Sequence, residues 1–117
     1  MFFPPKKARV GKTTMKCKQW EIWDANVKFD DSDEIKKRPV LVIDAESGIA
    51  IALKMTTHPP RDDNEYILKD WEKSGLKKPT TIRTSKVLHL LDSDIIKKRG
   101  SLTLKDRVAF TTLNKSK

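Results

Sequence analysis

The chain has 117 residues, a single cysteine and a net charge of +9, with 25 basic residues against 16 acidic ones. This length suits one domain with its own core. The lone Cys17 excludes an intrachain disulfide and a cysteine-based metal site. No stretch has the length and apolarity of a membrane-spanning helix or a secretory signal, so we expect no membrane association. A lone thiol fits the reducing cytoplasm best.

The positive charge is concentrated at the N-terminus. Residues 1–18 contain six basic residues and no acidic one, whereas residues 19–117 contain nineteen basic against sixteen acidic residues, a net charge of +3. We expect residues 1–18 to form a basic, flexible arm and residues 19–117 to form the folded domain. A basic arm attracts polyanions without sequence preference, so the charge favours a nucleic-acid partner.

The first half of the folded domain predicts three strands. Apolar and polar residues alternate over residues 21–29, which is typical of a half-buried strand. Residues 30–37 form a charged loop, and the continuous apolar run 39–43 indicates a central strand. A turn at 46–48 and a second apolar run over 49–55 complete a hairpin.

The second half predicts two further strands and short helices. Residues 58–64, with two prolines, form an exposed loop, and a short strand follows over 65–69. A single turn of helix over 71–74 is ended by Gly75. A long strand covers 80–91, and a short helix begins at Asp92 and Asp94 and is closed by Gly100.

A final helix begins at Thr103, because Thr103 and Asp106 form a capping box, and runs to about residue 114. Its expected apolar side consists of Leu104, Val108, Ala109 and Leu113. About five strands, short helices and a C-terminal helix predict an α+β, mainly β domain built as a small barrel.

Polar side chains stand at the ends of the two most apolar strands. Arg38 precedes one strand, and Thr56, Thr57 and His58 end the next. A guanidinium offers a planar fork to phosphate oxygens, and imidazole suits proton transfer near neutral pH. Together these groups fit chemistry on a phosphodiester. His58 and His89 are the only histidines and no carboxylate cluster accompanies them, so we expect no metal site and no cofactor.

These same residues carry a resemblance to a known family. Lys37-Arg38-Pro39-Val40-Leu41-Val42-Ile43 is similar to the signature of the MazF/PemK toxins of bacterial toxin–antitoxin pairs. Met55-Thr56-Thr57-His58 follows at the family's distance, and Thr81-Ile82-Arg83-Thr84 matches further along. The resemblance spans about residues 20–113, and residues 70–79 are similar to the Gram-positive, PemK-like branch.

The resemblance implies a toxin that acts as a metal-independent, sequence-selective endoribonuclease on single-stranded RNA, an mRNA interferase that arrests translation and growth. It implies an SH3-like barrel, a homodimer with RNA crossing its interface, and a small, acidic, partly disordered antitoxin as partner. Arg38 and Thr56 match the family's catalytic positions. Thr80 stands where some relatives have a carboxylate, so the general base is left open; His58 either transfers the proton or only binds RNA.

Five further residues are candidates for RNA contacts, each with a plain structural role as the alternative: Lys36, Lys37, Thr57, Arg61 and Arg83. Two other functions stay open at this point. One is a non-catalytic RNA-binding module of SH3-like fold, and the other is a toxin of the same fold that targets gyrase, because fold does not fix function.

Overall fold

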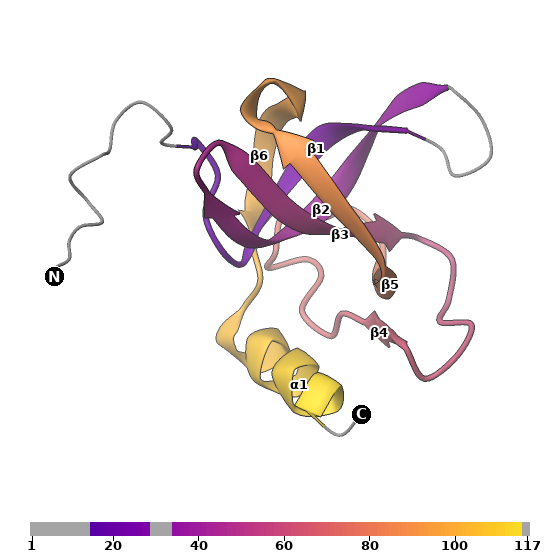
Figure 1. The fold of residues 1–117 in the computed structure, drawn as a ribbon. Helices are drawn as coiled ribbons and strands as arrows, with labels where there is room; N and C mark the ends of the chain where they lie inside the picture. Colours follow the sequence, from indigo (N-terminus) through magenta and orange to yellow (C-terminus); the bar gives the residue numbers. More distant parts are fainter. Residues whose placement is uncertain (1–14, 29–33, 116–117) are drawn as a thin grey trace, which may run out of the picture.

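The computed structural model describes residues 15–28 and 34–115. Within these ranges it forms one antiparallel sheet of six strands followed by a C-terminal helix (Figure 1), which confirms the α+β, mainly β class. One strand more than predicted is present. The elements are β1 (Glu21–Lys28), β2 (Ile35–Glu46), β3 (Ile49–Thr56), β4 (Glu65–Ile67), β5 (Thr81–Leu91), β6 (Ile95–Ser101) and α1 (Leu104–Lys115).

The sheet is strongly curved, as in a β-barrel. Its strand order is β4-β5-β3-β2-β1-β6, so β5 and β6 are separated by three other strands. In a flat sheet that separation is about 19 Å, at about 4.8 Å per strand spacing. The chain connects β5 to β6 through only the short 3₁₀ turn η2 (Asp92–Asp94), which spans about 14 Å when extended. The sheet therefore bends until β5 and β6 approach each other (Figure 1).

Each face of the sheet covers its own core, because side chains alternate between faces along a strand. One core is enclosed by the curled sheet and includes Trp23, Ala25, Val40 and Val42. The other lies under α1 and is made of these buried residues: Ile22, Leu41, Leu53, Met55, Leu68, Leu76, Ile82, Leu102 and Phe110. The hairpin of β2 and β3 predicted from the sequence is confirmed.

Several boundaries differ from the sequence-based expectation. Residues 35–37, expected in the charged loop, begin strand β2, and β4 ends at Ile67 instead of residue 69. Met15 and Cys17 are buried in the enclosed core, so the packed domain includes residues 15–18. The expected flexibility of the arm concerns residues 1–14, which lie outside the described residues, as does Phe29 of the first predicted strand. Strand β1 is buried on both faces over residues 22–25 rather than half-buried, because it lies between β2 and β6 and contributes to both cores.

The helix expected over residues 92–99 is wrong, because most of this segment is strand β6. Ile95 is buried opposite Ala25 of β1. The basic residues that resembled a helix C-terminus instead form ion pairs with β1: Lys98 Nζ lies 3.0 Å from Glu21 Oε2, and Arg99 Nη1 lies 3.2 Å from Asp24 Oδ1. Pairing with β1 outweighs the local helix signals.

The single helical turn expected at residues 71–74 is present but is too short to form a helix. The segment forms hydrogen-bonded turns, in which the Ser74 N–H donates to Asp70 O four residues earlier at 3.1 Å. Gly75 ends it with φ +90°, a conformation that side chains disfavour. Gly75 and Gly100 are in close backbone contact, since a Cβ on either would overlap the chain of the other. Gly100 is therefore a packing glycine within β6 and not a helix cap.

The start of α1 agrees with the prediction, but its buried side does not. The Asp106 N–H donates to Thr103 Oγ1 at 3.3 Å, as an N-cap requires. Leu104 and Val108 are 71% and 57% exposed, whereas Asp106 and Phe110 are buried. The helix turns its carboxylate inward because that group accepts hydrogen bonds from the segment after β4. Within the described residues, no helix combines the length and apolarity needed to cross a membrane.

Candidate functional site

A row of polar residues crosses one face of the sheet. In the β-ladder Lys54 of β3 lies between Val40 of β2 and Arg83 of β5, and Arg83 lies opposite Glu65 of β4. Residues directly opposite one another in neighbouring strands share a face. Arg38 is two residues before Val40, so its side chain is on the same face of β2. The strands thus bring charges from β2, β3, β4 and β5 to one surface.

This surface contains a pocket of about 140 Å³, enough for several water molecules or one phosphate group. Its lining consists of Val27, Arg38, Lys54, Met55, Thr56 and Arg83. Three of these six side chains are cationic and one carries a hydroxyl. Such a lining suits an anion with several oxygen acceptors.

Thr56 connects the pocket to the loop that follows β3. Its Oγ1 accepts a hydrogen bond of 3.1 Å from the His58 N–H. The His58 ring is exposed, and its Nδ1 lies 2.6 Å from the Pro59 carbonyl oxygen. Because a carbonyl only accepts, a hydrogen bond between these two atoms requires Nδ1 as the donor, and it then leaves Nε2 as the acceptor of the neutral ring.

On the other side of the pocket, Glu65 binds two arginines. Its Oε2 accepts from Arg83 Nε at 2.9 Å, and its Oε1 accepts from the Arg61 N–H at 3.0 Å. Arg61 Nη1 also lies 3.3 Å from both carboxylate oxygens. Burial alone raises the pKa of Glu65, but the hydrogen bonds and positive charges of Arg61 and Arg83 outweigh it. The net result is a pKa below the ordinary value of 4.5.

The lowered pKa of Glu65 predicts how stability depends on pH. The ionised carboxylate stabilises the fold above pH 4.5, and this contribution is lost as the pH falls through the lowered pKa. At neutral pH, Glu65→Gln should reduce the free energy of unfolding by about 1–3 kcal/mol. Urea denaturation of parent and variant, at neutral pH and below pH 4.5, measures this prediction. The difference between their free energies of unfolding should shrink in acid, and a difference of the same size at both pH values would contradict the prediction.

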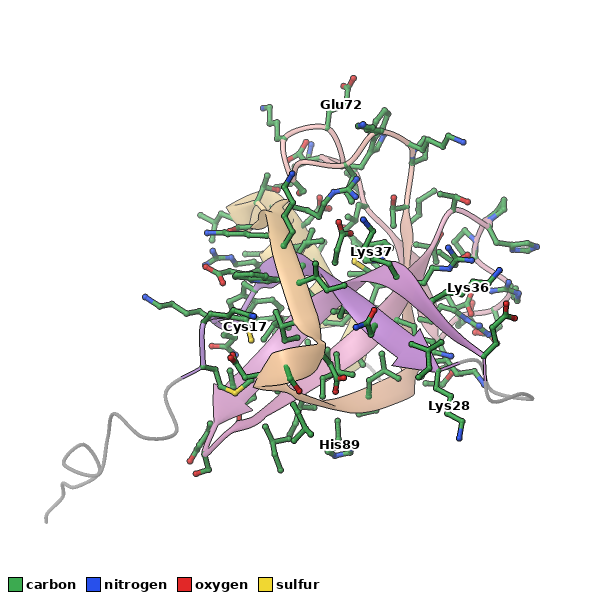
Figure 2. All side chains as sticks on the ribbon, turned by 90° about the horizontal axis from the view of Figure 1, so that it is seen from above. Cys17, Lys28, Lys36, Lys37, Glu72 and His89 are labelled. Carbon is green, nitrogen blue, oxygen red and sulfur yellow. The ribbon has the colours of Figure 1, made fainter. Side chains whose placement is uncertain are left out.

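The structure brings together some of the predicted residues and separates others. Arg38, Thr56 and Arg83 line the pocket. Lys36 lies on the same face of β2 as Arg38, near the exposed end of the β1–β2 hairpin (Figure 2), and Lys37 points to the opposite face. Three others are exposed in the loop after β3 and are not among the lining residues: Thr57, His58 and Arg61.

Sequence reasoning missed Lys54 and Glu65. Lys54 interrupts the apolar run of β3, and this single charge inside a buried strand was the available signal. Glu65 gave no local signal, because its role depends on the pairing of β4 with β5.

The residues that the structure describes offer neither a metal site nor an activated cysteine. Among residues 15–28 and 34–115, no group of three His, Cys, Asp or Glu side chains is placed to hold a metal ion. Cys17 is buried, and burial raises the pKa of its thiol, which disfavours the nucleophilic thiolate. Figure 2 shows Cys17 on the opposite side of the domain from Lys36.

Comparison with known proteins places the chain in a family. The family model described as PemK-like, MazF-like toxin of type II toxin–antitoxin system matches residues 18–110. The chain belongs to this toxin family. The match includes every residue that lines the pocket. No curated protein matched the sequence.

Solved structures of mycobacterial proteins share the fold. An endoribonuclease in complex with its cognate antitoxin, from a mycobacterial species, superimposes with a TM-score of 0.68 at 10% identity, covering 86% of this chain and 92% of its own. The Mycobacterium tuberculosis toxin MazF-mt6 has a TM-score of 0.63 at 19% identity, covering 80% of this chain and 90% of its own. At these identities the similarity concerns the fold.

Proposed function

We propose that this PemK-like toxin is a metal-independent endoribonuclease that cuts single-stranded RNA at selected sequences. The observation that carries the proposal is the pocket lined by Arg38, Lys54, Arg83 and Thr56, which places three cations and a hydroxyl in one site. Cations placed in this way stabilise the charge that develops on a phosphate during cleavage, which is often the largest single contribution to catalysis. Two structural neighbours bear the name endoribonuclease, in line with this activity.

The reaction we propose is attack of a ribose 2′-hydroxyl on the adjacent phosphorus. The 2′-oxygen–phosphorus bond forms as the bond to the 5′-oxygen breaks, giving a 2′,3′-cyclic phosphate and a free 5′-hydroxyl. A base removes the 2′-proton and an acid protonates the leaving oxygen, which typically contributes about 10²–10⁴-fold. Arg38 binds the phosphoryl oxygens and serves as donor toward the leaving oxygen.

Thr56 and His58 complete the proposed machinery. The Thr56 hydroxyl orients the phosphate inside the pocket. His58 follows at the pocket's edge, and the proton on Nδ1 leaves Nε2 as the acceptor for the 2′-proton. Because the His58 ring is outside the pocket lining, this role requires RNA that extends over the loop after β3.

RNA beyond the cleaved phosphate is proposed to follow exposed basic and polar residues on both sides of the pocket. Lys36 lies at the hairpin of β1 and β2 on the pocket's face of the sheet, and Thr57 and Arg61 lie on the loop after β3. Lys37 lies on the opposite face of β2, so its contact requires RNA that passes around the edge of the hairpin. Arg83 contributes inside the pocket. These side chains contact phosphates, which fix the strand's position without reading its sequence. We propose single-stranded RNA as the substrate, because the cleaved phosphate has to leave the line of its neighbours to enter the pocket. An unpaired strand can bend in this way more easily than a double helix can.

The proposal includes protein partners and a location. We propose a homodimer in the cytoplasm that is neutralised by a small, acidic, partly disordered antitoxin. An acidic partner complements the net charge of +9 and competes with RNA for the basic surface. A structural neighbour was solved with its cognate antitoxin. Several large apolar side chains are exposed, among them Ile49 and Leu91, which are cross-strand neighbours, and such surface favours a protein partner.

Induced expression in bacteria tests the function against its two rivals. Mapping of RNA 5′ ends should reveal new 5′-hydroxyl ends at one recurring short sequence, while chromosomal DNA stays intact. Growth arrest with broken DNA and intact RNA would instead indicate a gyrase-targeting toxin. RNA that is bound but uncut, with a steep salt dependence, would indicate a non-catalytic binding module.

A further inference from the structure

The Arg83 side chain lines the pocket from β5, and it forms an ion pair with Glu65 of β4. We infer that Glu65 is a positioning residue, which fixes Arg83 for the reaction and holds the adjoining loop against the pocket; this rests on the proposed nuclease function. Glu65 itself does not line the pocket, so it acts through Arg83 and Arg61.

The contact between Glu65 and Arg83 determines which part of the guanidinium faces the pocket. Glu65 has a side chain only 3% exposed, and its Oε2 lies 2.9 Å from Arg83 Nε. This bond uses the inner edge of the guanidinium and leaves the Nη groups outside the contact. Arg83 is 24% exposed at its side chain, which fits a group that is anchored at Nε and accessible at its tip. A planar guanidinium that is already held at Nε loses little entropy when it binds phosphate oxygens.

The backbone around Glu65 is rigid enough to make this positioning effective. β4 has only three residues, and Glu65 lies opposite Arg83 in the ladder. The Thr84 N–H donates to Asn64 O at 3.2 Å, and the Thr84 hydroxyl donates to the same carbonyl. Two hydrogen bonds from Thr84 of β5 therefore fix Asn64, the residue just before Glu65. This keeps the Glu65 carboxylate beside Arg83.

Glu65 also closes the loop of residues 57–64, which carries His58. The loop is tied at its start by the bond from the His58 N–H to Thr56, and near its end by the bonds from Arg61 to Glu65. Thr56 and Arg83 both line the pocket. One carboxylate thus connects the position of the pocket arginine with the position of the loop.

Removing the charge of Glu65 should affect RNA affinity and cleavage rate differently. Loss of a merely structural residue would lower both together. Replacing Glu65 by glutamine keeps the shape but removes a negative charge beside two cations, Arg61 and Arg83. Affinity for RNA should stay the same or rise, because the pocket becomes more positive. The cleavage rate should fall by about 10–100-fold, because Arg83 and the loop are no longer held in the reactive geometry.

The test compares Glu65→Gln with Glu72→Gln in the full chain. Glu72 is exposed on the turn after β4, remote from Lys36 and Lys37 in Figure 2, so its replacement makes the same charge change elsewhere. The rate at saturating RNA and the Kd for an uncleavable 2′-deoxy-substituted oligonucleotide are measured for each. We expect Glu65→Gln to lose rate without losing affinity, and Glu72→Gln to match the parent in both.

The outcomes distinguish this inference from the proposed function. A parent protein that does not cleave RNA overturns the function itself. An active parent with an equally fast Glu65→Gln variant overturns only the positioning role, and so does a parallel loss of rate and affinity. If Glu65→Gln does not fold, Glu65→Asp provides the second variant, because it keeps the charge but its shorter side chain withdraws the carboxylate from Arg83 Nε. Glu65→Asp at the parent's rate would also overturn the inference.

Discussion

Arg38→Ala should lower the rate of RNA cleavage by about 10²–10³-fold, the typical loss when one preorganised charge or donor is removed from a reacting phosphate or oxyanion. Arg38 lies on β2 opposite Ala25, on the face of the sheet that carries Lys54 and Arg83. Its side chain is exposed at the pocket and is not packed in either core. The substitution therefore leaves no buried cavity, and the loss of rate should occur in a folded protein.

Lys105→Ala provides the matched control for Arg38→Ala. Lys105 is exposed on α1, outside the pocket, and its removal lowers the net charge by the same amount. Single-turnover cleavage and thermal unfolding of parent and both variants separate the possibilities. The parent rate in Arg38→Ala would exclude Arg38 from the site, and an equal loss in both variants would mean that overall charge, not the pocket, sets the rate.

Asp106→Ala should lower the free energy of unfolding by about 3–5 kcal/mol, because it leaves several buried donors without their acceptor. The Asp106 carboxylate has no solvent exposure. It accepts from the Tyr66 hydroxyl at 2.7 Å, from the Lys69 N–H at 3.0 Å and from the Asp70 N–H at 2.8 Å. Burial raises the pKa of Tyr66, and the bond to Asp106 raises it further, so the hydroxyl stays a donor.

Asparagine at position 106 should give an intermediate loss. Its single carbonyl oxygen can replace Oδ1, which accepts from both Tyr66 and Lys69. Its amide nitrogen would replace Oδ2 and face the Asp70 N–H, donor against donor. Urea unfolding should therefore rank Asp106→Ala below Asp106→Asn, and both below Lys105→Ala, the exposed neighbour. Equal stability of Asp106→Ala and the control would show that this carboxylate does not hold α1 to the domain.

The sequence predicted those elements whose signals are local. The hairpin of β2 and β3 follows from two apolar runs around a Ser-Gly turn, and α1 begins where Thr103 caps it. The segment 92–99 shows the limit of this approach. Its acidic start and basic end indicate a helix, yet the basic residues pair with Glu21 and Asp24 across β1. Only the three-dimensional pairing reveals that alternative.

The pocket was predictable to a similar degree. Arg38 and Thr56 were predictable because each stands at the end of an apolar run of the sequence, and both line the pocket. Lys54 was overlooked as one charge within a strand, although such a charge inside an apolar run is costly unless it reaches a polar site. Glu65 depends on strand register, which composition and spacing do not encode. The position of α1 likewise depends on Asp106, whose carboxylate finds its partners 36 to 40 residues away.

One measurement tests the proposed nuclease most directly. The purified parent protein is incubated in EDTA with a pool of long transcripts that together contain every short base sequence, beside Arg38→Ala and Lys105→Ala. We expect discrete fragments with 2′,3′-cyclic phosphate ends from the parent and from Lys105→Ala, and largely intact RNA with Arg38→Ala over the time in which the parent completes cleavage. Intact RNA in all lanes, with the parent shown to be folded, would contradict the assignment of this pocket to metal-independent RNA cleavage.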